Sequence, residues 1–142
     1  FTRQQSDDPF AKTYMSWLGH YEFGLNHKVF DFGQPTPWQD DDKESLPFWI
    51  AVWINYYRYV VSLPADGQLY FIDYDDLLHS PRELTATLGG LLGVSFPAGD
   101  QAPFEPAPAP PVDLPADDPL VKTALEIYDK LVKKKVRVAG NS

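Results

Sequence analysis

The stretch QLYFIDYDDLLHSPRELTATLGGLLG, residues 68–93, decides the fold class of this chain. Its first part, Leu69–Tyr74, is apolar or aromatic on both faces except at Asp73, which predicts a strand in the middle of a sheet. No other segment offers that strand a convincing partner, and residues 28–32 and 135–138 are only weak strand candidates. The sheet that the strand needs is mostly missing, which predicts that the chain is part of a larger protein.

The second part of this stretch predicts a helix after a short acidic turn. Ser80 is the expected N-cap, Pro81 takes the first helical position, and Glu83 completes the spacing of a capping box. Gly93 is the expected C-terminal stop. A buried strand, a turn and a helix in this order predict an α/β fold that is predominantly helical as present. The alternative is an all-helical domain in which the strand is a short edge piece.

Apolar spacing predicts three further helices. The first begins at Asp8-Pro9, with Asp as N-cap, continues through Lys28 and ends at Asp31-Phe32-Gly33. The second covers residues 47–63 and is apolar nearly all round, so it is expected to be buried. The third begins at Asp118-Pro119 and frays into a basic tail.

We therefore expect a single partial domain across residues 1–142. Residues 1–96 hold helices and the strand-turn-helix unit, residues 97–116 form a Pro/Ala-rich arm, and residues 117–138 form the C-terminal helix.

Composition narrows the classes of partner. A chain of 142 residues with 44% hydrophobic residues can form one core, and a net charge of −8 predicts no nucleic-acid partner. Cysteine is absent, which excludes disulfides and thiolate metal sites and fits a cytoplasmic location. No apolar span is long enough to cross a bilayer, so no membrane partner is expected. The chain begins at Phe1 without a Met, so we expect a processed, trimmed or partial product.

Three polar features are candidates for chemistry. No phosphate-binding glycine loop or zinc pattern occurs, although His20 and His27 lie seven residues apart and would share a helical face. The simpler interpretation is that each is a partly buried or surface histidine. Asp73, Asp75 and Asp76 follow the predicted strand, where ligands bind in parallel sheets, or they cap the turn and pair with a neighbouring helix. The basic tail at residues 133–137 either stabilises its helix C-terminus or contacts an anionic cofactor.

Aromatic residues are dense in the first two predicted helices, and they comprise Tyr14, Trp17, Tyr21, Trp49, Trp53, Tyr56 and Tyr57. They either pack two helices together or line a pocket for an apolar or aromatic acceptor. Four side chains are the best candidates for substrate binding because each has a polar group beside a possible opening: Trp17, His20, Tyr21 and Tyr56.

The run from Phe48 to Val94 resembles the C-terminal half of PAPS-dependent sulfotransferases. That family follows an aromatic helix with a strand ending in Tyr-Glu/Asp-Asp-Leu, then Asp/Ser-Pro, then a helix closing in Leu-Gly. The matching residues are Tyr74, Asp75, Asp76, Leu77, Ser80, Pro81, Leu92 and Gly93. The opening DDPFAKTYMSWLGHYEFGLNHKVFDF is similar to the segment after the 3′-phosphate-binding residues in one bacterial-type branch, so the resemblance covers residues 1 to about 135.

The resemblance implies a P-loop-NTPase-like sulfotransferase fold that transfers a sulfuryl group from PAPS to a hydroxyl or amine of a small-molecule or glycan acceptor. The family's 5′-phosphosulfate loop and its 3′-phosphate-binding Arg and Ser have no match in this sequence. We therefore expect no catalytic or cofactor-binding residue in the chain, and no PAPS bound to it or turned over by it alone. We also expect a homo-oligomer through the exposed sheet surface. The alternative is an independent, mostly helical interaction domain that uses its aromatic face and Pro-rich arm.

Overall fold

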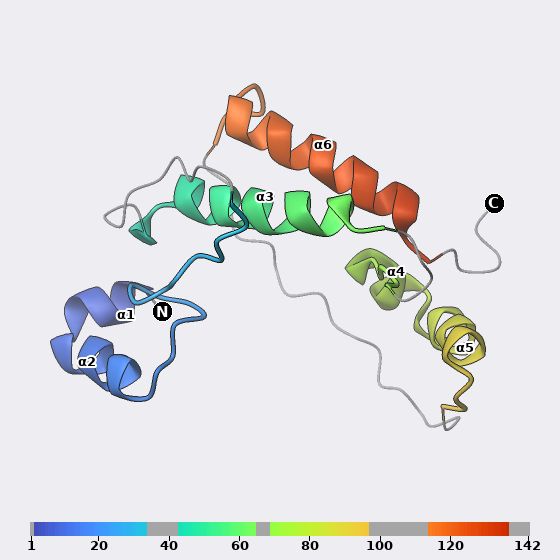
Figure 1. The fold of residues 1–142 in the computed structure, drawn as a ribbon, viewed down its shortest axis with the longest axis horizontal. Coiled ribbons are helices and arrows are strands. Elements are labelled where there is room, and N and C mark those ends of the chain that lie inside the picture. Colours follow the sequence, from blue (N-terminus) through green and yellow to red (C-terminus); the bar gives the residue numbers. More distant parts are fainter. Residues whose placement is uncertain (1, 34–42, 65–68, 97–113, 137–142) are drawn as a thin grey trace. The chain divides into compact units, whose positions relative to one another are not determined.

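The computed structural model describes residues 2–33, 43–64, 69–96 and 114–136, and this part of the chain is predominantly helical (Figure 1). Its helices are α1 (Thr2–Asp7), α2 (Pro9–Trp17), α3 (Leu46–Ser62), α4 (Tyr74–His79), α5 (Pro81–Leu92) and α6 (Pro119–Lys134). The described residues contain no strand, so the α/β expectation is replaced by a helical one for them. The Pro/Ala-rich arm lies outside the described residues except at its last three positions.

The chain divides into two compact units. Unit 1 comprises Phe1–Leu63 and Leu114–Ile127, and unit 2 comprises Pro64–Asp113 and Tyr128–Ser142. None of the helices in the described ranges is long and apolar enough to cross a membrane.

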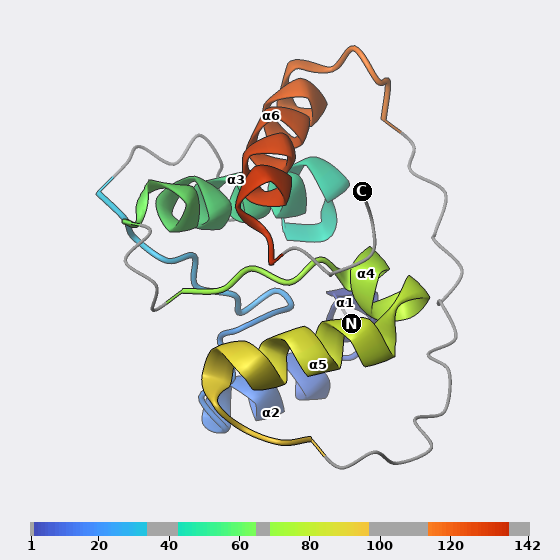
Figure 2. The same ribbon diagram turned by 90° about the vertical axis from the view of Figure 1, so that its right-hand side faces the viewer.

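Unit 1 opens with two short helices that lie against each other (Figures 1 and 2). α2 begins as the sequence predicts, because the Asp8 side chain accepts a hydrogen bond from the Phe10 N–H at 2.9 Å. It ends at Trp17 rather than continuing to Lys28, so the predicted length is wrong. Gly19 takes a left-handed φ of 69° and lets the His20 N–H reach the Met15 carbonyl at 3.1 Å. That bond closes the helix end and turns the chain away.

α1 is a helix that apolar spacing does not predict. Its Gln5 side chain is buried, at 2% exposure, and its Oε1 accepts a hydrogen bond from the Leu25 N–H at 2.6 Å. This contact fixes the loop after α2 onto α1, and it passes close to Gly24. A Cβ added at Gly24 would lie 2.1 Å from Gln5 Oε1.

We expect the substitution Gly24→Ala to destabilise unit 1 by about 2 kcal/mol, because it combines a left-handed backbone with a collision against a buried side chain. Gly19→Ala is the matched control, since its φ of 69° is close to the 76° of Gly24 but nothing lies within 4 Å of its Cβ. Chemical denaturation of both variants measures the difference. Equal losses would show that the Gln5 contact contributes nothing.

α3 is the longest helix of unit 1 and starts where Ser45 caps it, with the Ser45 Oγ accepting from the Phe48 N–H at 3.3 Å. Phe48, Ala51 and Ile54 are buried at 2%, 6% and 5% exposure. The expectation that the helix is buried all round is wrong, because Tyr56 and Tyr59 are exposed by 42% and 44%. Their rings contact Phe32, with centroids 6.2 and 4.4 Å away.

Unit 2 begins its described part with an extended segment, residues 69–73, in place of the predicted strand. A single parallel bridge joins Phe71 to Lys135, and the Val136 N–H donates to the Phe71 carbonyl at 2.8 Å. The weak strand candidate at 135–138 therefore supplies this partner through its first residue, Lys135. Its last two residues lie outside the described part. An extended segment becomes a strand only when a ladder of such bonds forms, and one bridge is not a ladder.

The predicted acidic turn is the helix α4, so that prediction is wrong. Asp73 caps α4, and Ser80 both ends it and begins α5, which Figure 2 shows as a separate helix after a turn. The Ser80 side chain makes no cap hydrogen bond. The predictions that Pro81 opens α5 and that Gly93 ends it are confirmed. Leu84 is buried at 1% exposure, whereas Leu91 and Leu92 are exposed.

α6 begins as predicted, because the Asp118 Oδ1 accepts from the Leu120 N–H at 2.7 Å. Ile127 and Leu131 are buried on it, while Tyr128 is exposed by 42%. The boundary between the two units falls between Ile127 and Tyr128, within this helix.

Candidate functional site

An apolar hollow of about 270 Å³ lies beside α3 in unit 1. Aromatic rings dominate its walls, and the principal lining residues are His27, Phe30, Phe32, Trp49, Trp53 and Tyr56. Ligand pockets usually measure about 300–1,000 Å³, so this hollow suits a small ligand of one or two rings. It is the candidate functional site of unit 1.

The extended segment after His27 builds one wall of this aromatic hollow. Phe30 and Phe32 are two residues apart, so their side chains leave an extended backbone on the same side. Both rings contact Tyr56, with centroids 6.1 and 6.2 Å away, and Phe32 stacks on Tyr59 at 4.4 Å. The Asn55 Nδ2 donates to the Phe30 carbonyl at 3.0 Å, which fixes this segment to α3.

His27 is a polar residue in the wall of the aromatic hollow and is only 7% exposed. Its Nδ1 lies 2.8 Å from the Glu22 carbonyl oxygen, which can only accept, so Nδ1 carries the hydrogen. The ring lies 5.0 Å from the Trp49 ring and 6.3 Å from the Phe48 ring. Its Nε2 is buried and has no hydrogen-bond partner among the described residues.

The structure separates the four predicted substrate-binding residues. Tyr56 lines the aromatic hollow, while Tyr21 lines a second hollow of unit 1, where the Lys28 ammonium lies 3.8 Å from the centre of its ring. His20 pairs with Glu22 at 3.1 Å. Trp17 is 73% exposed at the end of α2 and meets Phe10 edge-on. Neither Trp17 nor His20 lines either of these hollows.

Sequence reasoning missed three residues of the aromatic hollow. Phe30 and Phe32 were assigned only to a weak strand, although their two-residue spacing beside an aromatic helix was an available signal. The shared helical face considered for His20 and His27 does not form, because α2 ends at Trp17. The loop that places His27 depends on Gln5 and Gly24, and no local pattern indicates that contact.

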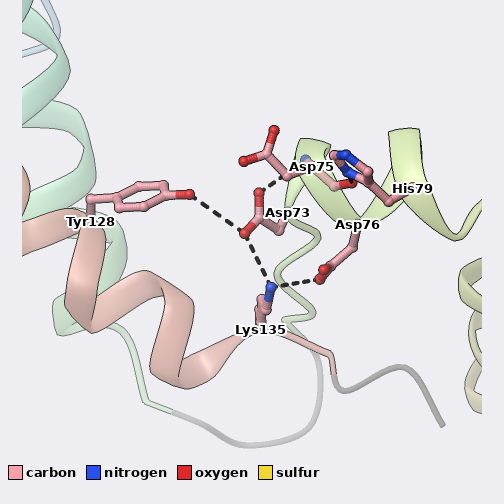
Figure 3. A network of polar contacts seen from close by, with 6 residues as sticks. All are labelled: Asp73, Asp75, Asp76, His79, Tyr128 and Lys135. Carbon is pink, nitrogen blue, oxygen red and sulfur yellow. Dashed lines mark hydrogen bonds and ion pairs between the residues drawn. The ribbon is translucent and has the colours of Figure 1, made fainter. Parts of the chain in front are cut away.

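The acidic residues of unit 2 form a charge network around Lys135 (Figure 3). The Lys135 Nζ lies 3.1 Å from Asp73 Oδ2 and 2.7 Å from Asp76 Oδ2. The other oxygen of Asp73 accepts from the Asp75 N–H at 3.1 Å and caps α4. The Tyr128 hydroxyl lies 3.5 Å from Asp73. This agrees with the capping and ion-pairing interpretation of these residues, although Asp73 caps a helix rather than a turn and Lys135 follows the last residue of α6.

The pKa directions agree with a charged network. Removal of the Asp73 carboxylate from water acts to raise its pKa, but the Asp75 N–H and the Lys135 ammonium outweigh this and hold the pKa below 3.8. The hydrogen bond to Asp76 raises the pKa of Lys135 above 10.5, against the loss of hydration, and Asp73 adds to the increase. Burial and the nearby Asp73 and Asp75 charges raise the pKa of the Tyr128 hydroxyl above 10.0. Asp73 and Lys135 are therefore charged at neutral pH, the Tyr128 hydroxyl keeps its proton, and the ion pairs join α4 to the end of α6.

Of the basic tail at residues 133–137, this network involves only Lys135. Its ammonium is held by two carboxylates of the same chain. Within the described ranges, no group of three or more histidine, aspartate or glutamate side chains is arranged to hold a metal ion. The geometry of the network indicates a structural role.

Comparison with known proteins identifies no relative: no family model, curated protein or solved structure matches the chain.

Proposed function

We propose that this chain is the acceptor-side part of a PAPS-dependent sulfotransferase, in which the aromatic hollow holds the apolar body of a hydroxyl- or amine-bearing acceptor. The aromatic hollow is the observation that carries the proposal. It is small, almost entirely apolar, and lined by rings that stack on planar groups. The sulfotransferase assignment itself rests on the sequence motif from Tyr74 to Gly93.

The donor side is the second element of the proposal. The sequence holds no match to the family's 5′-phosphosulfate loop, and the acidic network of unit 2 would repel phosphate. Sulfuryl transfer needs donors that stabilise the sulfate, so a complete enzyme requires another segment to supply them. A cytoplasmic location and a P-loop-like fold of the complete enzyme belong to the same proposal.

A titration with 2-naphthol, followed by tryptophan fluorescence, tests the acceptor site. We expect saturable quenching, because Trp49 and Trp53 line the hollow. Phe32→Ala and Tyr56→Ala should each weaken binding about fivefold, since one lost aromatic contact costs about 1 kcal/mol. Phe10→Ala is the control, because Phe10 is 63% exposed and does not line the hollow. Quenching that does not saturate would rule out this site. An equal loss of affinity in all three variants, the control included, would rule it out as well.

An interaction domain is the second candidate function, and specific exposed residues favour it. On α2, Phe10, Tyr14 and Trp17 are exposed by 63%, 47% and 73%, and Phe10 stacks on Tyr14 at 5.8 Å. In unit 2, Leu69 and Ile72 are exposed on the extended segment. Exposed apolar surfaces of this kind commonly bind protein partners. We propose self-association on this basis, and a clean monomer in light scattering would count against it.

A further inference from the structure

A second hollow of unit 1 is basic, although the chain as a whole is acidic. It measures about 610 Å³, and the charged residues in its wall are Lys12, Lys28, Lys43 and Glu44. Three of the 12 basic residues of a chain with a net charge of −8 therefore line one hollow. Such a local excess attracts anions against the overall repulsion.

Two of these lysines have no carboxylate partner among the residues that the structure describes. The Lys28 ammonium lies over the Tyr21 ring, at 3.8 Å from its centre, and this contact holds it at the wall. Lys12 follows the first turn of α2, and its carbonyl accepts a hydrogen bond from Asn26 at 2.9 Å. Both lysines are exposed, so their charges are available to a ligand. The Glu44 carboxylate accepts a hydrogen bond from the Ser6 hydroxyl.

A buried group without a partner lies in the same wall. His27 lines this basic hollow as well as the aromatic one, and it is 93% buried, since its exposure is 7%. Its Nε2 exposes less than 1 Å² and has no partner among the described residues. Buried polar atoms in native structures are almost always paired, and an unpaired one in the wall of a hollow indicates that a ligand or water supplies the missing bond.

We infer that this basic hollow binds the oxyanion of a small molecule, namely a carboxylate, sulfate or phosphate group. Lysines act on such a group as separate point charges, which accommodates all three chemistries. The inference does not depend on the proposed sulfotransferase function, because it concerns only the charge and the unpaired imidazole of unit 1.

Calorimetric titration of the whole chain with sodium sulfate, sodium phosphate and sodium benzoate tests the inference, with sodium chloride at matched ionic strength as the reference. We expect saturable binding of at least one oxyanion and none of chloride. The double substitution K12Q/K28Q should weaken that binding about tenfold or more, because hydrogen bonds to charged groups are the strong ones. The benzoate arm separates carboxylates from the two inorganic anions.

The matched control is K122Q/K130Q, which removes the same charge from exposed positions of α6. It should leave oxyanion binding unchanged, and circular dichroism confirms that both double variants remain folded. Binding that falls equally in both double variants would reveal a general charge effect and overturn the inference. Heats that match those of chloride in the parent chain would overturn it as well.

Discussion

Replacing Phe48 with alanine is expected to lower the free energy of unfolding by about 3–5 kcal/mol, a larger loss than at any other position discussed for this chain. Phe48 is 2% exposed, and its ring meets those of His27 and Trp49 edge-on at 6.3 and 5.2 Å. Alanine would leave a cavity under the wall of the aromatic hollow, because neighbouring side chains relax only in part. Urea denaturation followed by circular dichroism measures the loss.

Phe10→Ala is the control for Phe48→Ala, since it removes the same atoms from a helix position that is 63% exposed. Its cost should stay below about 1 kcal/mol. Similar losses at both positions would contradict the claim that Phe48 forms the core of unit 1. A smaller tryptophan response to 2-naphthol in Phe48→Ala would further connect this core to the hollow.

Replacing Lys135 with methionine is expected to cost about 2–3 kcal/mol, because it leaves two carboxylates without their shared cation. The side chains of Asp73, Asp76 and Lys135 are 13%, 18% and 26% exposed, so they are screened less than a surface pair and more than a fully buried one. Lys133→Met is the control, because Lys133 is exposed on the last turn of α6. A loss at position 133 equal to that at 135 would show that the two ion pairs add no stability.

The pH dependence of unfolding provides a second observation on the same network. The pKa of Asp73 is lowered on folding, so its contribution is present above the unfolded value of 3.8 and is lost as the pH falls through the folded pKa. The pKa of Lys135 is raised, so its contribution is present below 10.5 and is lost as the pH rises through the folded pKa. Lys135→Met should therefore reduce the dependence at both extremes, and an unchanged profile would contradict the assignment.

Much of the helical structure could be predicted from the sequence, because its signals are local. Asp8 and Asp118 cap α2 and α6 as expected, and Gly93 ends α5. The helix that was expected to continue to Lys28 ended earlier because Gly19 takes a left-handed conformation that apolar spacing does not reveal. The prediction of a strand was wrong for a different reason. Leu69–Asp73 has strand-like residues, but a ladder requires neighbours, and only Lys135 bridges to it among the described residues.

The candidate site could be predicted only in part. Tyr56 was selected from an aromatic helix that apolar spacing reveals, and it lines the aromatic hollow. Trp17 and His20 were selected for their polar groups, but α2 ends at Trp17 and neither side chain lines the two hollows described for unit 1. His27 depends on a loop held by Gln5, which lies more than 20 residues earlier in the chain. Single-sequence patterns contain no information on such a contact.

The central claim is that this chain holds the acceptor side of a sulfotransferase and lacks the donor side. Calorimetry of one sample with two ligands tests it most directly. We predict saturable binding of 2-naphthol, and binding of 3′-phosphoadenosine 5′-phosphate no tighter than that of inorganic phosphate. Micromolar affinity for the nucleotide together with no saturable binding of 2-naphthol would contradict the claim in both parts.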